Sequence, residues 1–121
     1  VLEGIANEVA DLLAAMKKDA GRRIPVLRVD GGASACDVLM QIQADLAGIP
    51  IDRPSDVETT ALGAAMMAGL GAGVWRDATE LAAVRGTDTV FRPQIPASAR
   101  REARGTWRRA VRRARGWHQV P

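Results

Sequence analysis

The alternation of helical and strand-like segments constrains the fold of this chain more than any other feature of its sequence. Apolar residues at helical spacing alternate with short, β-branched runs bounded by Gly and Pro. Strands that alternate with helices indicate an α/β layer with parallel strand pairing. Two strands are too few for a sheet that stands alone, so we expect part of a larger domain. The expected elements are helices over 1–20, 34–48 and 58–75 and strands over 24–29 and 49–54.

Three further segments complete this outline. We expect a short helix over 77–84, an extended segment over 91–96 and a closing Arg-rich helix over 97–117. The longest stretch without a charged side chain is 59–75, which is rich in Gly and Ala rather than in Leu and Phe. That composition favours a buried helix over a membrane span, so no membrane partner is expected.

Length and composition exclude several classes of protein. With 121 residues, 47% of them hydrophobic and 26% charged, the chain has room for one compact domain or a piece of one. A single cysteine, Cys36, cannot form an internal disulfide, which predicts a reducing, cytoplasmic location. Cys36 and His118 are too few for a zinc site, and the position of His118 does not suggest a serine triad. The first ten residues show no targeting segment.

The charge is unevenly placed along the chain. Residues 1–95 carry nine basic and thirteen acidic side chains, a net charge of −4, whereas 96–121 carry eight Arg and one Glu, a net charge of +7. A basic segment can meet nucleic acid or an anionic surface, but a solvated basic helix face is the commoner explanation. Drawn as a helix, the arginines surround much of its circumference instead of forming one stripe.

A Gly-Gly turn stands where the first strand gives way to a helix. Its sequence is Asp30-Gly31-Gly32-Ala33-Ser34. Ligands of α/β sheets bind at the carboxyl ends of the strands, and two glycines let a ligand approach the main chain without hindrance from a Cβ. A tight turn whose glycines only relieve backbone strain explains the same residues equally well. The pattern is neither the dinucleotide fingerprint nor the Walker phosphate loop.

A second candidate site opens the helix over 58–75. Thr59 or Thr60 is expected to cap this helix, and Glu58 suits the positive end of its dipole. Small residues such as Gly63 would let another backbone approach closely. For Thr59, Thr60 and Gly63 we favour packing against the sheet over binding of a ligand.

Both motifs belong to a longer series of short blocks. The blocks, in chain order, are Arg28–Ser34, Leu39–Gln41, Gln43–Leu46, Gly48–Pro50, Arg53–Pro54, Glu58–Ala65, Ala68–Leu70, Gly73–Trp75, Phe91–Pro93 and Trp107–Val111 through Gly116–Trp117. Their order and spacing closely resemble the C-terminal part of the glycerol kinases, within the FGGY carbohydrate kinase family. The resemblance covers nearly the whole chain, and its specificity comes from the series rather than from any one block.

The resemblance implies a fold and a reaction. These kinases have two domains of the actin-like, ribonuclease-H-like ATPase fold, with the active site between them. They transfer the γ-phosphoryl group of Mg-ATP to a polyol hydroxyl, which yields glycerol 3-phosphate from glycerol. For this chain the resemblance implies an α/β fold, with helices packed on a partial, mainly parallel sheet. Residues 1–121 would be the C-terminal, nucleotide-side part of such a domain, and 96–121 its Arg-rich closing helix.

The resemblance also implies a nucleotide site. The family's Gly-Gly-Ala turn closes over the adenosine part of ATP or ADP, so Gly31, Gly32 and Ala33 would contact the nucleotide through their backbone. Cys36, followed by Asp37, stands where the family usually has the Asn that faces the adenine. A thiol hydrogen-bonds weakly compared with an amide, which predicts weaker or rearranged contacts with the base. We expect Cys36 to be a partly buried thiol and not a nucleophile.

The family's catalytic machinery, by the same resemblance, lies upstream of these residues. The catalytic base, the polyol-binding residues and the first phosphate loop have no counterpart here, and neither have Mg²⁺ ligands. No catalytic or metal-binding residue is therefore assigned, and the chain alone is expected to be inactive, because phosphoryl transfer depends on those parts. Its expected partners are ATP or ADP, and glycerol or a similar polyol only together with the upstream part.

Two alternatives stay open. The Arg-rich segment, with Trp107 and Trp117, would offer phosphate contacts and stacking surfaces to nucleic acid. The family resemblance favours instead a surface helix that packs back on the domain. A partial sheet with unpaired edges also predicts a structural remnant that self-associates as a homo-oligomer.

Overall fold

Three short strands form the sheet of this protein: β1 (Leu27–Arg28), β2 (Ile51–Pro54) and β3 (Thr87–Phe91). They are seen in a computed structural model that describes residues 1–84 and 87–115. The predicted parallel pair is confirmed in β1 and β2, whereas β3 runs antiparallel to β2, so the sheet is mixed rather than mainly parallel. The sequence predicts only an extended segment from Phe91 onward. It does not predict the strand before it, because β3 owes its conformation to long-range pairing with β2.

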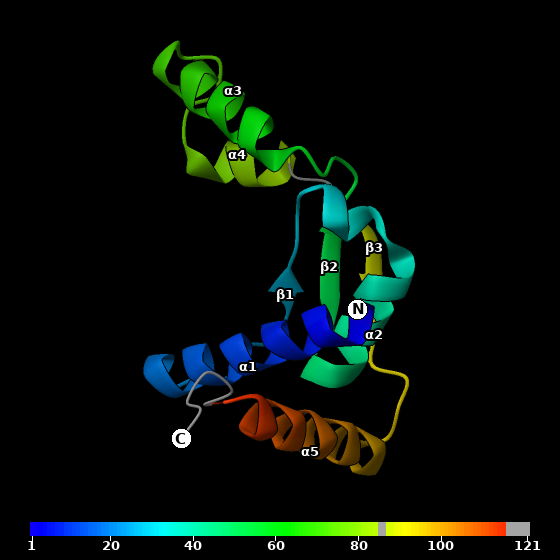
Figure 1. Ribbon diagram of the computed structural model, residues 1–121. Coiled ribbons are helices and arrows are strands. Elements are labelled where there is room, and N and C mark those ends of the chain that lie inside the picture. Colours follow the sequence, from blue (N-terminus) through cyan, green and yellow to red (C-terminus); the bar gives the residue numbers. More distant parts are fainter. Residues whose placement is uncertain (85–86, 116–121) are drawn as a thin grey trace.

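α1 (Leu2–Ala20) and α5 (Ala97–Ala114) lie at the end of the sheet where β1 and β2 begin, and α2 (Asp37–Ala47) runs back along the sheet from the turn after β1 to the start of β2 (Figure 1). α1 and α2 pack on each other, and α5 lies against both. α1 ends at Gly21 and α2 at Gly48, the two stop signals that the sequence offers. Between β1 and α2 the chain forms a short 3-10 helix, η1 (Gly32–Ala35), so regular α-helix begins three residues later than expected.

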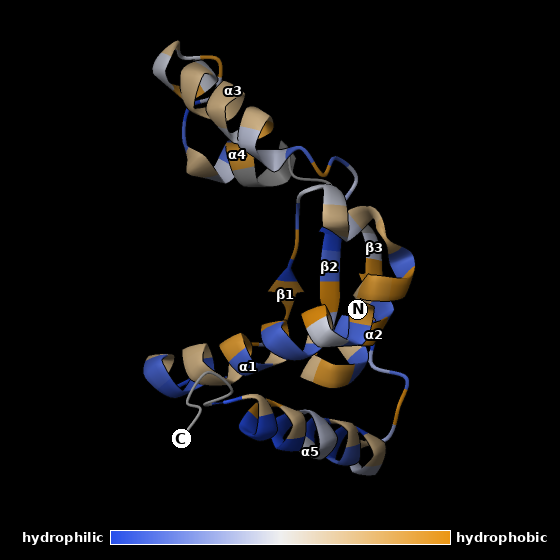
Figure 2. Ribbon diagram, viewed as in Figure 1, coloured by the Kyte–Doolittle hydropathy of each residue, from blue (hydrophilic) through white to orange (hydrophobic). Residues whose placement is uncertain are grey.

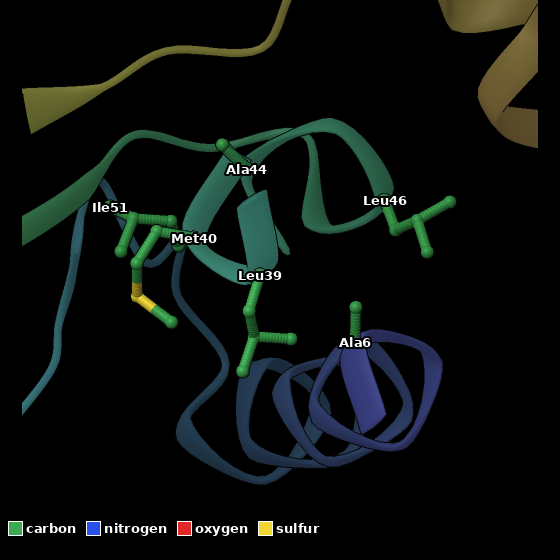
Figure 3. Close-up of a cluster of buried hydrophobic side chains, with 6 residues drawn as sticks. All are labelled: Ala6, Leu39, Met40, Ala44, Leu46 and Ile51. Carbon is green, nitrogen blue, oxygen red and sulfur yellow. The ribbon is translucent and has the colours of Figure 1, made fainter. Parts of the chain in front are cut away.

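The hydrophobic core lies between α1, α2 and β2. Figure 3 shows Leu39 and Ala6 in the space between α2 and α1, and Met40 beside Ile51. The buried members of the cluster are Ala6, Leu39, Met40, Ala44, Leu46 and Ile51. Half-buried apolar side chains from β1, β3 and α5 pack around this cluster, Leu27, Phe91 and Ala103 among them. The core therefore holds the sheet and three helices together.

Two helices project from the end of the sheet where β1 and β2 stop. α3 (Thr59–Gly71) and α4 (Ala78–Val84) stand apart from the other helices, beyond the carboxyl ends of β1 and β2 (Figure 1). α3 is the apolar helix expected from the sequence, and Figure 2 colours it largely toward the hydrophobic end of the scale. None of its thirteen residues is buried, so the expectation of a buried helix is wrong for this chain. Across residues 1–84 and 87–115, no helix combines the length and the hydropathy that a membrane crossing requires.

Candidate functional site

The Gly-Gly turn lies at the carboxyl end of β1, next to the segment that leads from β2 into α3 (Figure 1). Gly31 has φ 77° and ψ 167°, a combination that is essentially reserved for glycine. η1 starts at the next residue and turns the chain into α2. The turn therefore occupies the place where α/β sheets bind ligands, as predicted, and its first glycine is required by the backbone.

Hydrogen bonds hold the turn from within. The Gly31 amide donates to the Val57 carbonyl at 2.9 Å, which ties the turn to the segment after β2. The Ser34 amide and hydroxyl both donate to the Gly31 carbonyl, at 3.0 and 2.7 Å, and Ser34 is buried. The Cys36 amide donates to the Ala33 carbonyl at 3.2 Å. These bonds give the turn one defined shape before any ligand arrives.

Gly32 shares with Gly4, Gly63 and Gly71 the lack of a reason inside the described chain for being glycine, and it is the one of these four that lies on the turn. Its φ is not positive, and a Cβ placed on it would meet nothing within 4 Å. Gly32 and Ala33 are both exposed, and they stand first in η1, where amides have no earlier turn to bond to. Neither backbone strain nor packing requires a glycine at position 32. A close approach of something outside the chain would require one.

Cys36 is exposed, which corrects the expectation of a partly buried thiol. It is the residue before α2, and its side chain makes no capping hydrogen bond there. The thiol sits four residues after Gly32 on the same turn. The four residues implied by the resemblance, Gly31, Gly32, Ala33 and Cys36, thus lie on one continuous stretch at the sheet's edge.

The second motif is built differently from the prediction. The residue before α3 is Glu58, and the side chains of Thr59 and Thr60 do not cap that helix. Thr59 donates instead to the Asp30 carboxylate, which joins α3 to the turn. A Cβ on Gly63 would meet nothing within 4 Å, so the packing expected at this glycine is absent from the residues that the structure describes.

A cavity of about 380 Å³ lies between these two motifs. Arg28 and Asp30 line it from the β1 side, and Thr59, Gly63 and Met66 line it from α3. The cavity brings both sequence motifs to one hollow beside the turn. Within the described residues, no three His, Cys, Asp or Glu side chains come together as a metal site.

Sequence reasoning assigned no role to Arg53 of β2, which the structure places beside the candidate site. Its side chain is only 12% exposed and reaches back to the turn and to the start of α2. A charged residue within a short buried strand was the available signal, since such a side chain needs partners to be tolerated there.

The Arg-rich helix α5 packs back on the body of the protein, as the family resemblance implies. Arg100 donates through Nε to the Asp45 carbonyl at 2.7 Å. Arg104 donates to the carbonyl and the side-chain oxygen of Asn7, both at 2.8 Å. Two of the seven arginines of α5 therefore serve as anchors to α1 and α2. Trp117 and His118 lie outside the described residues.

A carboxylate on α1 completes this contact. Asp11 accepts hydrogen bonds from Arg104 and, at 2.8 Å, from Trp107 Nε1. Partial burial acts to raise the pKa of Asp11, but the hydrogen bonds from Trp107 and Arg104 and the charges of Arg104 and Arg108 outweigh it, so the pKa lies below its ordinary value. The charged form of this group is thus part of the α1–α5 interface.

Comparison with known proteins gives a consistent result. Residues 1–72 match the model of the C-terminal domain of the FGGY family of carbohydrate kinases. The glycerol kinase of Symbiobacterium thermophilum is 53% identical over 116 residues, which is 96% of this chain and 23% of that protein. The glycerol kinase of Myxococcus xanthus is 47% identical over 114 residues, 94% of this chain and 23% of that protein. The chain thus spans just under a quarter of the length of these curated relatives.

Solved structures agree with the sequence comparison. The crystal structure of Plasmodium falciparum glycerol kinase with ADP superposes with a TM-score of 0.81 and 32% identity, over 93% of this chain and 22% of that one. The xylulose kinase from Lactobacillus acidophilus superposes with a TM-score of 0.69 at 21% identity, over 90% of this chain and 21% of that one, which speaks for the fold alone. These likenesses confirm the predicted fold class, part of an actin-like ATPase domain.

Proposed function

This chain belongs to the FGGY family of carbohydrate kinases, and on that premise we propose that it is the C-terminal, nucleotide-binding part of a glycerol kinase. The whole enzyme would transfer the γ-phosphoryl group of ATP to glycerol, giving glycerol 3-phosphate and ADP. Residues 1–121 would form one unit, with the Arg-rich helix closing it. A reducing, cytoplasmic compartment fits the single cysteine.

Gly32 carries the proposal. Neither backbone strain nor a contact inside the described chain requires glycine at this position. Gly32 faces open space at the edge of the sheet where α/β folds bind ligands. A nucleotide that approaches the main chain at this point would fill the space where a Cβ would otherwise stand. The turn residues therefore fit the adenosine part of ATP or ADP, the ligand that the solved relative carries as ADP.

The four proposed contact residues have different parts to perform. Gly31 already gives its amide to Val57, so it contributes the shape of the turn. Gly32 and Ala33 present exposed backbone to the nucleotide. Cys36 lies where the base would stand, and its exposed thiol makes a weaker partner than an amide would.

Catalysis itself would need groups that this chain does not assemble. Mg²⁺ accompanies ATP in phosphoryl transfer, but the described residues do not gather a ligand set for it, and we assign it no residue. The base and the polyol pocket are expected from the rest of a longer enzyme. We therefore propose that the chain binds nucleotide and does not by itself phosphorylate glycerol.

The test is a thermal unfolding scan with and without Mg-ADP, on the wild type and on Gly32→Val. Since the added side chain meets only open space, the variant should fold like the wild type. Mg-ADP at a hundredfold excess over its Kd should stabilise the wild type by about 2.7 kcal/mol and the variant by much less. Gly4→Val, at a glycine of α1 that is also without neighbours within 4 Å, is the matched control. An equal shift in all three proteins would sink the site assignment.

A second candidate function, self-association as a structural remnant, has one observation in its favour. α3 is apolar along its length and none of its residues is buried. Exposed apolar surface of this kind promotes association. The two proposals are compatible, because α3 projects beyond the turn and does not cover it (Figure 1).

A further inference from the structure

Arg53 reaches from the central strand to the candidate nucleotide site. One guanidinium nitrogen, Nη1, donates to the Ser34 carbonyl at 3.1 Å and to Asp37 Oδ1 at 2.6 Å. The other, Nη2, donates to Thr89 Oγ1 on β3 at 3.3 Å. The guanidinium lies over the Phe91 ring, 5.2 Å from its centroid. One side chain thus joins β2 and β3 to η1 and to the first residue of α2.

One of these contacts meets the turn at Ser34, its buried residue. Ser34 is 2% exposed, and its amide and hydroxyl both bond back to the Gly31 carbonyl. The Ser34 carbonyl accepts a hydrogen bond from Arg53. Ser34 is therefore bonded both to Gly31 within the turn and to Arg53 on β2. Gly32 and Ala33, which lie between these fixed points, are left facing outward.

We propose that Arg53 is a positioning residue for nucleotide binding, which holds the Gly31–Cys36 turn in its binding shape through the Ser34 carbonyl and the Asp37 carboxylate. The proposal rests on the nucleotide site proposed above. A planar, always-charged guanidinium can keep several acceptors in a fixed relation, which a single amine cannot do. A ligand that meets a turn already in place does not have to order it, and this raises its affinity.

Removing the guanidinium leaves the Ser34 carbonyl without this donor inside the protein. A buried carbonyl in that state is costly, so the turn is expected to shift toward water. The amides of Gly32 and Ala33 move with it. Arg53→Lys keeps a positive charge near Asp37 but loses the planar guanidinium with its two donating nitrogens. It should therefore bind better than Arg53→Ala and less well than the wild type.

Arg104 provides a matched control for a merely structural effect. Its side chain is 13% exposed, against 12% for Arg53, and it also bonds one backbone carbonyl and one carboxylate. It does so at the α1–α5 interface, on elements that do not form the turn. Arg104→Ala should therefore lower stability in a comparable way without touching the nucleotide site.

The experiment compares wild type, Arg53→Ala, Arg53→Lys and Arg104→Ala at a temperature where all are folded. Amide NMR spectra without ligand report the turn, and titration with Mg-ADP gives Kd. For Arg53→Ala we expect displaced amide signals from Gly32 to Cys36 and a Kd raised ~10-fold or more, since small misplacements of positioned groups have effects of that size. Arg104→Ala should leave both within about twofold of the wild type.

Each other outcome has a definite meaning. Unmoved turn signals in Arg53→Ala, or an equal loss of affinity in Arg53→Ala and Arg104→Ala, would overturn the positioning role while leaving the nucleotide site standing. A wild type that does not bind Mg-ADP would overturn the proposed function and this inference with it. Should Arg53→Ala not fold, Asp37→Asn removes the charged half of the contact at a side chain that is 72% exposed, and the same displaced signals and weaker binding are expected.

Discussion

At the scale of single residues, Gly48 shows how one position can carry two constraints. It ends α2 with φ 71°, in the left-handed region that other residues adopt at a cost. Arg100 also crosses over it, so a Cβ would stand 2.2 Å from Arg100 Nη1. That guanidinium is held by its bond to the Asp45 carbonyl. Substitution at Gly48 therefore strains the backbone and displaces an anchor of α5 together.

Gly48→Ala is accordingly expected to lower the free energy of unfolding by about 2–3 kcal/mol, the sum of a left-handed backbone penalty and one lost hydrogen bond. Urea unfolding measures the change. Gly21→Ala is the matched control, because Gly21 ends α1 with φ 62° but has no neighbour within 4 Å of its Cβ position. It should show the backbone penalty alone. Equal losses in the two variants would mean that Arg100 moves aside freely.

At the scale of elements, the contact between α1 and α5 depends on the charge of Asp11. Its carboxylate receives Arg104 and Trp107, and its pKa is lowered in the folded protein. As the pH falls, Asp11 is protonated in the unfolded chain before it is protonated in the folded one. The stabilisation is therefore complete above the ordinary pKa of 3.8 and is lost as the pH falls through the lower pKa of the folded state.

The melting temperature should therefore fall as the pH is lowered below about 4, and it should fall less steeply in Asp11→Asn. The variant should also melt below the wild type at neutral pH, where the charged contact is intact only in the wild type. Thermal scans by circular dichroism over pH 2–7 follow both effects. Glu8→Gln, at an exposed position of the same helix, should behave as the wild type does. Identical pH profiles for Asp11→Asn and wild type would show that the contact does not couple α1 to α5.

Elements with a local signal were predictable, and those that depend on distant partners were not. α1 and α2 are amphipathic and end at glycines, so the sequence places both. β3 was missed because its strand conformation comes from pairing with β2. The same limit applies to the site. A Gly-Gly turn after a strand is visible in sequence, but the reach of Arg53 to Ser34 depends on how the strands and η1 come together.

At the scale of the whole molecule, the apolar helix α3 lies outside the core that holds the other elements. Its sequence predicts burial, yet Met67 is 66% exposed, and Val74 just beyond the helix is 67% exposed. Apolar surface that remains in water favours association. In a purified sample, a second copy of the chain is the partner available to cover α3. α1 also carries exposed apolar side chains, Ile5, Leu12 and Met16 among them, so it is the surface with which α3 has to be compared.

We expect the wild type to sediment as concentration-dependent oligomers and Met67→Lys to shift that equilibrium toward monomer. Lysine is a good helix former and the position is exposed, so the melting temperature should change little. Leu12→Lys removes a similarly exposed apolar side chain, 61% accessible, from α1 instead. Sedimentation velocity over a concentration series compares the three proteins. If Leu12→Lys disperses the oligomers and Met67→Lys does not, the associating surface lies on α1. A wild type that stays monomeric throughout would show that α3 tolerates exposure, and self-association would then be withdrawn as a candidate function.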